Sequence, residues 1–428
     1  MSGVSRVLTL FAFAAVWAGA AAAQTPLPSS LQALAGVALG AEVSTALPPE
    51  DQQPATRQAV IEQAQAEKAG KLQPYVPNRA EEIFRRFDAV LARGTPNWHP
   101  FFQNAYAGGG FTLGLGRATF VSPYNYVDVR GSWTFKNYKR LEAEFIAPRL
   151  FHRRAALSVL GGWREATQVG FYGLGNDTSE ENRTNYLFEQ PYLSAMLDYY
   201  PTRKVLLLRG GVEWTQWSQQ PGTGSFPSVE TVYTPATLPG LGAEVDYLHF
   251  TYGVGLDWRT SPGYTRRGGF LAAMVHQYHD NDDEFGFRFI EYEAIQHIPI
   301  LREAWVLAFR ARVQTSNAHD GEQTPFFMLP SVGGGSSLRG YSSWRFRDTN
   351  SLLLQGEWRI AVNRYFDLAF FYDAGKVASR TADLDFDHLK SDWGVGTRFH
   401  GPFSTPLRIE IAKSREGLSL IFASSASF

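Results

Sequence analysis

The sequence contains no cysteine in its 428 residues. Disulfides, thiolate catalysis, lipoprotein anchoring and cysteine-based zinc sites are therefore excluded. The chain also has almost no net charge, because 40 Lys and Arg residues are balanced by 41 Asp and Glu residues. Such a balance argues against a nucleic-acid partner. After residue 23, no run of about 18 apolar residues occurs, so the sequence offers no membrane-spanning helix.

Aromatic residues and glycine are abundant instead. Phe, Tyr and Trp make up 14% of the chain and Gly occurs 40 times, which favours many β-strands over an α/β enzyme. Mean hydropathy is negative. This value is compatible with an outer-membrane barrel, because only every second residue of a barrel strand faces lipid.

The first 100 residues predict export and a leader segment. Residues 1–23 resemble a secretory signal peptide, with Arg6 in the positive region, a short apolar core and small residues before the cleavage site. A single transmembrane anchor is the alternative, but the apolar core is too short for one. Residues 24–100 are predicted to be a periplasmic leader with two short helices, at 57–71 and 79–93.

From residue 101 the apolar residues recur with the period of a strand. In 246–259, for example, Leu248, Phe250 and Tyr252 alternate with polar residues. A soluble sandwich would also alternate. Aromatic-rich apolar faces on segments of about ten residues, with charges on the opposite face, favour a membrane barrel. We therefore predict an all-β fold, a 16-stranded antiparallel transmembrane β-barrel over 101–428, after a short and partly helical N-terminal segment.

The number of predicted strands is even, as single-chain bacterial barrels require, and the long connections all follow odd-numbered strands. The first segment has the poorest alternation. The predicted strands are 102–107, 111–120, 125–135, 139–147, 154–166, 184–199, 203–217, 246–259, 267–279, 286–297, 303–315, 350–361, 365–374, 390–399, 406–413 and 418–428.

The predicted loop 316–349 carries the candidate site. Three consecutive glycines, 333–335, permit positive φ and close backbone approach, and they are followed by Leu338, Arg339, Gly340 and Tyr341. Strand parity points Glu357 and Asp373 into the lumen beside this loop. Arg339 can pair with such carboxylates in a bidentate, charge-assisted geometry. A flexible glycine-rich surface loop is the alternative.

The run Leu338-Arg339-Gly340-Tyr341 resembles the inward-folded loop motif of the bacterial surface antigen family, the family of BamA/TamA-type barrels. Residues 370–377, with Asp373-Ala374-Gly375, resemble a later strand motif of that family. The resemblance implies a sixteen-stranded outer-membrane barrel in which Arg339 locks the loop onto Asp373, with Glu357 as a second partner. It also implies a short member of the family, without the periplasmic POTRA modules that bind clients.

The chain ends on Phe428, which shares a parity with Leu418, Leu420 and Phe422 in the predicted last strand. A terminal aromatic resembles the carboxy-terminal signal that such barrels present to the insertion machinery, and a chance final Phe is the alternative. The sequence has no Gly-x-Ser-x-Gly elbow. His276 and His279 are expected on opposite faces of a strand, so we predict no metal site and no cofactor.

The favoured hypothesis is a barrel without enzymatic activity, exported to the bacterial outer membrane. It would insert or translocate protein or lipid, with a weak seam between residues 102–120 and 418–428. The expected partners are outer-membrane lipid, lipopolysaccharide and unfolded protein or lipid clients, with no nucleic acid, and the barrel is predicted to be monomeric. A passive pore or structural barrel is the first alternative, and an outer-membrane lipase is the second. The sequence names no client and assigns no role to the two helices.

Overall fold

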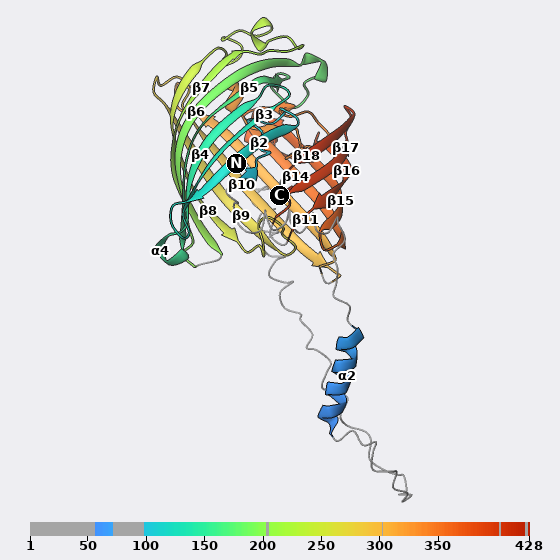
Figure 1. The fold of residues 1–428 in the computed structure, drawn as a ribbon. Helices are drawn as coiled ribbons and strands as arrows, with labels where there is room; N and C mark the ends of the chain where they lie inside the picture. Colours follow the sequence, from blue (N-terminus) through green and yellow to red (C-terminus); the bar gives the residue numbers. More distant parts are fainter. Residues whose placement is uncertain (1–55, 72–97, 203–204, 302, 402–403, 424–426) are drawn as a thin grey trace, which may run out of the picture. The chain divides into compact units, whose positions relative to one another are not determined.

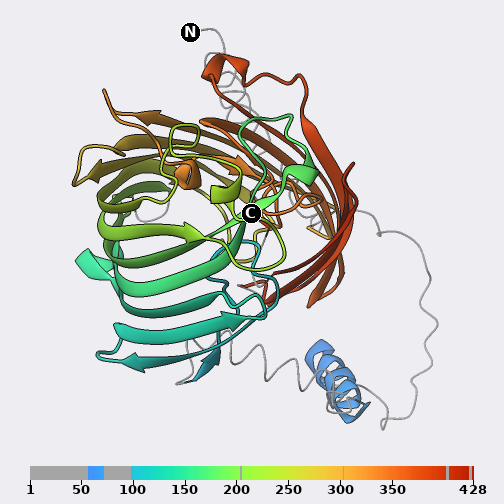
Figure 2. The same ribbon diagram turned by 90° about the horizontal axis from the view of Figure 1, so that it is seen from above.

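The computed structural model describes residues 56–71, 98–202, 205–301, 303–401, 404–423 and 427–428. Its main element is one antiparallel sheet of 16 strands that curves into a barrel (Figures 1 and 2). The strands of this sheet are β1 (His99–Pro100), β2 (Thr112–Phe120), β3 (Tyr126–Thr134), β4 (Lys139–Arg149), β5 (Ala155–Phe171), β6 (Thr184–Tyr199), β7 (Leu206–Pro221), β8 (Glu244–Asp257), β9 (Gly268–Asp280), β10 (Phe287–Ile300), β11 (Trp305–Ala318), β14 (Asn350–Asn363), β15 (Phe366–Ala378), β16 (Lys390–Phe399), β17 (Leu407–Lys413) and β18 (Leu418–Ala423).

Neighbouring strands in the sheet follow chain order, and β11 pairs with β14. The long connection between β11 and β14 holds a separate small hairpin, formed by β12 (Ser331–Val332) and β13 (Phe346–Arg347). Short helical segments lie in this connection and in several others. They are α4 (Leu150–Arg153), η1 (Glu180–Asn182), η2 (Val229–Thr231), η3 (Phe326–Met328) and η4 (Thr381–Asp383).

The predicted fold class, strand number and antiparallel order are confirmed. The first and last predicted strands are wrong in extent. Residues 102–107 form no strand; β1 is only His99–Pro100, and the chain then turns inward, where Phe101 lies under Arg130 and Arg140. The last strand ends at Ala423, five residues before the predicted end. In the described part of the chain, no strand pairing joins β18 to β1 or β2.

The two ends of the barrel differ in their connections. One end carries the long connections 172–183, 222–243, 319–349 and 379–389, and we call it the loop end. The other carries short turns such as 121–125 and 364–365, and we call it the turn end. This is the asymmetry that membrane barrels have between their outer and periplasmic sides.

Strand β8 illustrates how the alternation produces two faces. Phe250 and Tyr252 are 38% and 50% exposed, because they lie on the outer face, where only lipid can cover them. His249 and Thr251, between and beside them, are buried in the lumen. Successive side chains of a strand point to opposite faces, so a pattern of period two is enough to specify both.

The lumen is filled at the loop end by a cluster of apolar side chains. Phe326 of η3 makes edge-to-face contacts with Phe171 of β5 and Tyr186 of β6, at ring-centroid distances of 5.1 and 5.0 Å. The loops at this end therefore share a buried core with the strand ends. Other buried members are Phe188, Trp217, Val229, Leu238, Tyr247, Phe287 and Phe327.

Helix α2 (Arg57–Lys71) belongs to a unit separate from the barrel. It begins after Thr56, whose Oγ1 accepts a hydrogen bond from the backbone N–H of Ala59 at 3.2 Å. Its bounds coincide with those of the first predicted helix. The predicted signal peptide 1–23 and the predicted helix 79–93 lie outside the described residues. Within the described residues, no helix has both the length and the apolar character needed to cross a membrane.

Outward positions of β8 should tolerate charge according to their depth. Phe250→Arg, near the middle of the strand, should destabilise the barrel by about 2–4 kcal/mol, whereas Leu256→Arg, near the turn end, should cost about 0–1 kcal/mol. The free energy of unfolding in lipid vesicles, measured by denaturant titration, tests this. Equal effects at both positions would mean that this face does not cross the hydrocarbon core.

Candidate functional site

The loop between β11 and β14 folds into the lumen and carries its own apolar contacts. Leu338 and Tyr341 are buried together with Val332 and Phe346 of the β12–β13 hairpin. The same cluster includes Leu353 of β14, together with Val377 of β15, both on the inner wall. Apolar contacts alone therefore pack the loop against the barrel wall, and the charged contacts add to them.

Arg339 is the centre of the site. Its guanidinium binds Asp373 with two parallel contacts, Nε to Oδ2 at 2.6 Å and Nη2 to Oδ1 at 2.7 Å. Nη1 reaches Oε1 of Glu357 at 2.6 Å and Oε1 of Glu410 at 3.1 Å. Only 1% of the Arg339 side chain is exposed, and the three carboxylates are fully buried. The structure thus brings together the three residues predicted from the sequence and adds Glu410.

An aromatic ring completes the surroundings of this cation. The guanidinium carbon of Arg339 lies 3.5 Å from the centroid of the Phe371 ring. Phe371 points inward from β15, two residues before Asp373. A cation over a ring face gains electrostatic attraction, most strongly where water is excluded. The ring and the carboxylates therefore act on the same buried charge.

Three further arginines extend the charged network across the inner wall. Arg398 of β16 contacts Glu357 and Glu410 at 2.7 and 2.9 Å, and Arg359 of β14 contacts Glu357 at 2.7 Å. Arg408 of β17 contacts Glu410 at 3.3 Å. Each buried charge needs an opposite charge nearby, because an isolated ion is costly to move out of water. The network meets this need across four neighbouring strands.

Two glycines of the loop hold positions that other residues would not fit. Gly333 has φ of +125°, and a Cβ placed there would lie 2.4 Å from the carbonyl oxygen of Ser342. A Cβ on Gly340 would lie 2.6 Å from the Cβ of Asp392 on β16. The glycine beside Arg339 therefore lets the backbone press against the wall, so that the guanidinium reaches its partners.

Two other buried arginines, Arg345 and Arg347, were missed by sequence reasoning. Arg345 donates to Thr178 Oγ1 at 2.8 Å and forms an ion pair with Glu416 at 2.8 Å. Arg347 donates to the carbonyl oxygen of Phe326 at 2.9 Å. The signal available in the sequence was an Arg-x-Arg pair in an otherwise weakly charged loop. The partners of Arg345 lie on other connections, and the partner of Arg347 lies 21 residues earlier in the same connection, so no local pattern identified them.

The loop also contacts both ends of the sheet. On the β18 side, Ser419 Oγ donates to the carbonyl oxygen of Gly340 at 3.3 Å. On the β1 side, Trp344 Nε1 donates to the carbonyl oxygen of Ala107 at 3.0 Å, and its ring stacks on Tyr106 at 4.4 Å. The first and last strands, which are not paired with each other, are thus joined through this loop.

The C-terminus lies inside the barrel (Figure 2). Ser427 Oγ accepts hydrogen bonds from Arg359 at 3.1 Å and from Arg398 at 3.3 Å. The ring of Phe428 lies 5.3 Å from the guanidinium carbon of Arg359 and 6.1 Å from the ring of His297. The predicted extent of the last strand, 418–428, is therefore wrong: β18 ends at Ala423, and the ring of Phe428 lies on the inner side, beside Arg359 and His297.

The two histidines considered for metal binding are separated by the wall. His276 faces the lumen, where its Nδ1 lies 3.0 Å from Nε2 of His249 and 3.2 Å from Oγ1 of Thr251. His279 is exposed on the outer face, edge-on to Phe250. Within the described ranges, no three His, Asp or Glu side chains are arranged to hold a metal ion.

Replacing Arg339 should weaken the barrel without preventing its insertion. Arg339→Ala leaves buried carboxylates without their shared cation, which we expect to cost about 3–5 kcal/mol of unfolding free energy. The readout is the temperature at which the folded band disappears in heat-shift gels. Arg267→Ala is the matched control: it removes the exposed 3.7 Å contact with Glu303 and should change the free energy by less than about 1 kcal/mol. An unchanged transition in Arg339→Ala would show that the cation does not hold the loop.

Comparison with known proteins gives consistent results. A family model described as the Omp85 superfamily domain matches residues 283–417, which include the inward loop and the strands β14 to β17 that bind Arg339. A search of curated protein sequences gave no match. The match to the family model agrees with the resemblance found in the loop motif and in residues 370–377.

Solved structures share the fold of the barrel. The crystal structure of BamA from Haemophilus ducreyi lacking POTRA domains 1–3 aligns with a TM-score of 0.55 and 13% identity, over 77% of this chain and 68% of that one. CdiB from Escherichia coli aligns with a TM-score of 0.52 and 12% identity, over 76% of this chain and 61% of that one. Residues 283–417 of the chain therefore match the Omp85 superfamily domain, and its barrel shares the fold of BamA and CdiB.

Proposed function

We propose that this barrel works at the bacterial outer membrane in the insertion or translocation of protein or lipid clients. The observation that carries the proposal is the pair of sheet edges, one at β1 and the part of β2 beyond it and the other at β18, which are not paired with each other in the described residues. An unpaired strand edge presents a row of backbone donors and acceptors, and an incoming strand can satisfy them.

The lengths of the edge strands support a seam at this place. β1 has two residues and β18 has six, whereas β5 and β6 have 17 and 16. Short strands provide few hydrogen bonds to break when a client enters. The sequence predicted the seam between residues 102–120 and 418–428. We now propose that it lies between strands β1 and β2 on one side and β18 on the other.

A barrel with an opening seam needs another element to hold its ends. The Arg339 loop has the required contacts, with Gly340 at β18 and Trp344 at the segment after β1. We propose that Arg339 locks the loop to the β14–β17 wall, so that the loop maintains the barrel while the edges separate. The role as a lock rests on burial and on the bidentate pair with Asp373.

A freely conducting pore is less well supported. The loop with Arg339 crosses the lumen, and the apolar cluster around Phe326 fills the loop end. Water and ions would have to pass a packed core, in which polar groups lose hydration. We therefore propose that clients enter sideways through the seam between the edge strands, and that ions and water do not flow along the barrel axis.

The proposed location follows from the topology. In the outer membrane, the loop end would face the cell exterior and the turn end the periplasm. The predicted signal peptide 1–23 would bring the chain there. Phe428 would serve as the insertion signal before it reaches its inward position beside Arg359.

Client contact should be confined to the seam. Benzoylphenylalanine replaces Leu113 on β2, Leu420 on β18 or, as control, Tyr252 on β8; these outward side chains are 49%, 58% and 50% exposed. We expect light-induced crosslinks in cells to unfolded outer-membrane protein from the first two positions only. Equal crosslinking at all three positions contradicts the proposal. So does an absence of crosslinks accompanied by steady bilayer conductance, which is the behaviour of a passive pore.

A further inference from the structure

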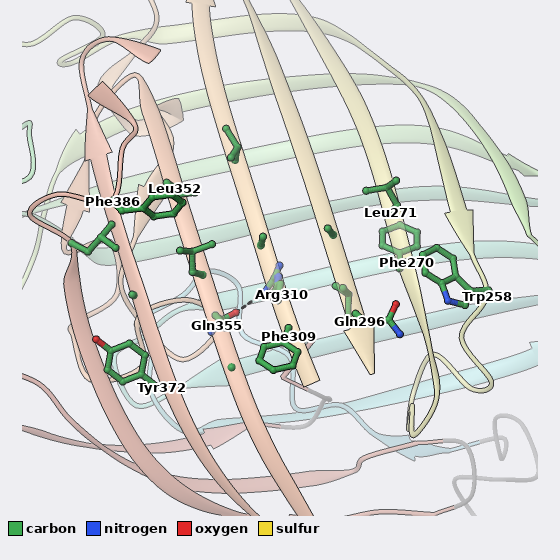
Figure 3. Close-up of a pocket in the computed structure, with 18 residues that line it drawn as sticks. Trp258, Phe270, Leu271, Gln296, Phe309, Arg310, Leu352, Gln355, Tyr372 and Phe386 are labelled. Carbon is green, nitrogen blue, oxygen red and sulfur yellow. Dashed lines mark hydrogen bonds between the residues drawn. The ribbon is translucent and has the colours of Figure 1, made fainter. Parts of the chain in front are cut away.

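The outer wall of the barrel contains an apolar hollow with a volume of about 650 Å³ (Figure 3). It spans β9 to β15, and its volume falls within the range of about 300–1,000 Å³ that is typical of ligand sites. The side chains of Phe309, Tyr372 and Phe386 border it (Figure 3). Ala294 and Ala311 also line it.

The strand register explains the shape of the hollow. Ala294, Ala311, Leu354 and Ala374 are register partners across β10, β11, β14 and β15, so small residues form most of one row. The next row toward the turn end holds Phe309 and Tyr372, with Gly356 between them. A row of small side chains beside a row of large ones leaves a depression along the wall.

A loop from the loop end covers the upper part of this depression. The connection 379–389, which we call the flap, folds against the outer wall and buries Leu384 on Val313 and Leu352. Phe386 of the flap, 54% exposed, forms the border of the hollow on that side. Val313 and Leu352 face outward, yet they are only 5% and 3% exposed, because the flap replaces lipid at these positions.

Polar contacts hold the flap in place. Lys376 Nζ donates to Asp385 Oδ1 at 2.8 Å and to the carbonyl oxygen of Asp387 at 2.9 Å. Asn176 Nδ2 donates to the carbonyl oxygen of His388 at 3.0 Å, which ties the flap to the β5–β6 connection. The hollow is therefore bounded on one side by the flap, which these hydrogen bonds fix in place, and elsewhere by side chains of the strands. A chance gap between side chains would lack such a fixed border.

The medium restricts what can fill the hollow. Most of its lining is apolar. Gln296, Arg310 and Gln355 also line it, but Arg310 donates to Gln355 Oε1 at 3.2 Å, so water would find few hydrogen-bond partners there. An empty hollow would forfeit the dispersion contacts of its lining. Within a bilayer, the only abundant filler is a hydrocarbon chain, which is held by packing because lipid and protein surfaces are equally apolar there.

The position of the flap selects the leaflet. The flap lies at the loop end, which faces the cell exterior in the proposed outer-membrane orientation. Arg380, at the start of the flap, has a side chain that is 76% exposed and paired only with the partly exposed Asp383 among the described ion pairs. Such a cation is available to a phosphate at the lipid headgroup level.

We propose that the hollow binds one acyl chain of lipid A, the membrane anchor of lipopolysaccharide, with the flap covering the chain. The inference depends on the proposed outer-membrane location, but not on client insertion. It adds a specific lipid site on β10–β15, away from the seam between β2 and β18. The row of alanines and the flap residue Phe386 determine the fit of the chain.

The test is native mass spectrometry of the full chain extracted from outer membranes in mild detergent and supplied with purified lipid A. Wild-type protein should retain lipid A. Ala311→Trp, which fills the floor, and Phe386→Ser, which removes the border, should each lower retention by about tenfold. Ala143→Trp is the matched control, because Ala143 is an outward alanine on β4, far from the hollow, and retention should be unchanged.

Folding of each variant is checked by the heat-shift gel, and Phe386→Ser changes only an exposed flap residue. Equal retention in wild type, Ala311→Trp and Phe386→Ser would overturn the proposal, as would wild-type protein that retains glycerophospholipid in preference to lipid A. Absence of the chain from outer-membrane fractions would instead overturn the proposed location. Seam crosslinking is measured separately, so a failure of client insertion would be distinguishable from a failure of lipid binding.

Discussion

One buried guanidinium determines how the interior of this barrel is organised. Arg339 has no access to water, so its charge must be balanced by groups on the wall. Asp373, Glu357 and Glu410 provide that balance, and they come from three strands, β15, β14 and β17. Those carboxylates in turn require Arg398 and Arg359. The inward loop and the charged half of the lumen therefore form a single unit, and removing one member leaves the others uncompensated.

This unit explains how a sheet with unpaired ends can remain a barrel. A closed barrel is held by the hydrogen bonds between its first and last strands. Here those bonds are missing in the described residues, and the loop joins the two ends through Gly340 and Trp344. In the function proposed above, these interior contacts would persist while the seam opens, because none of them runs between β18 and β1 or β2.

Much of the fold was accessible from the sequence, because strand alternation is a local property. The same parity placed Glu357 and Asp373 on the inner wall. Glu410 was not predicted, because nothing in its own strand marks it as a partner of a loop 71 residues away. The first strand was predicted wrongly for a related reason. The backbone N–H of Phe101 still donates to the carbonyl oxygen of Gly114 on β2 at 3.0 Å, but Tyr106 lies outside the strands and stacks on Trp344 of the inward loop. The prediction that the last strand extends to Phe428 was wrong because Ser427 accepts hydrogen bonds from Arg359 and Arg398, which places Ser427 on the inner side of the wall.

Strand geometry also allows one part of the wall to have a charged inner face and an apolar outer face. On β14, Gln355 points inward and donates to Asp373 at 3.1 Å, while its neighbour Leu354 lies on the outer face in the hollow. On β15, Asp373 points inward, while Tyr372 and Ala374 lie outside. Because neighbouring side chains point to opposite faces, a substitution at an outward position of the hollow, such as Leu354 or Ala374, leaves the Arg339 contacts in place. The charged interior and the lipid-facing surface can therefore be altered separately, although the same backbone holds both.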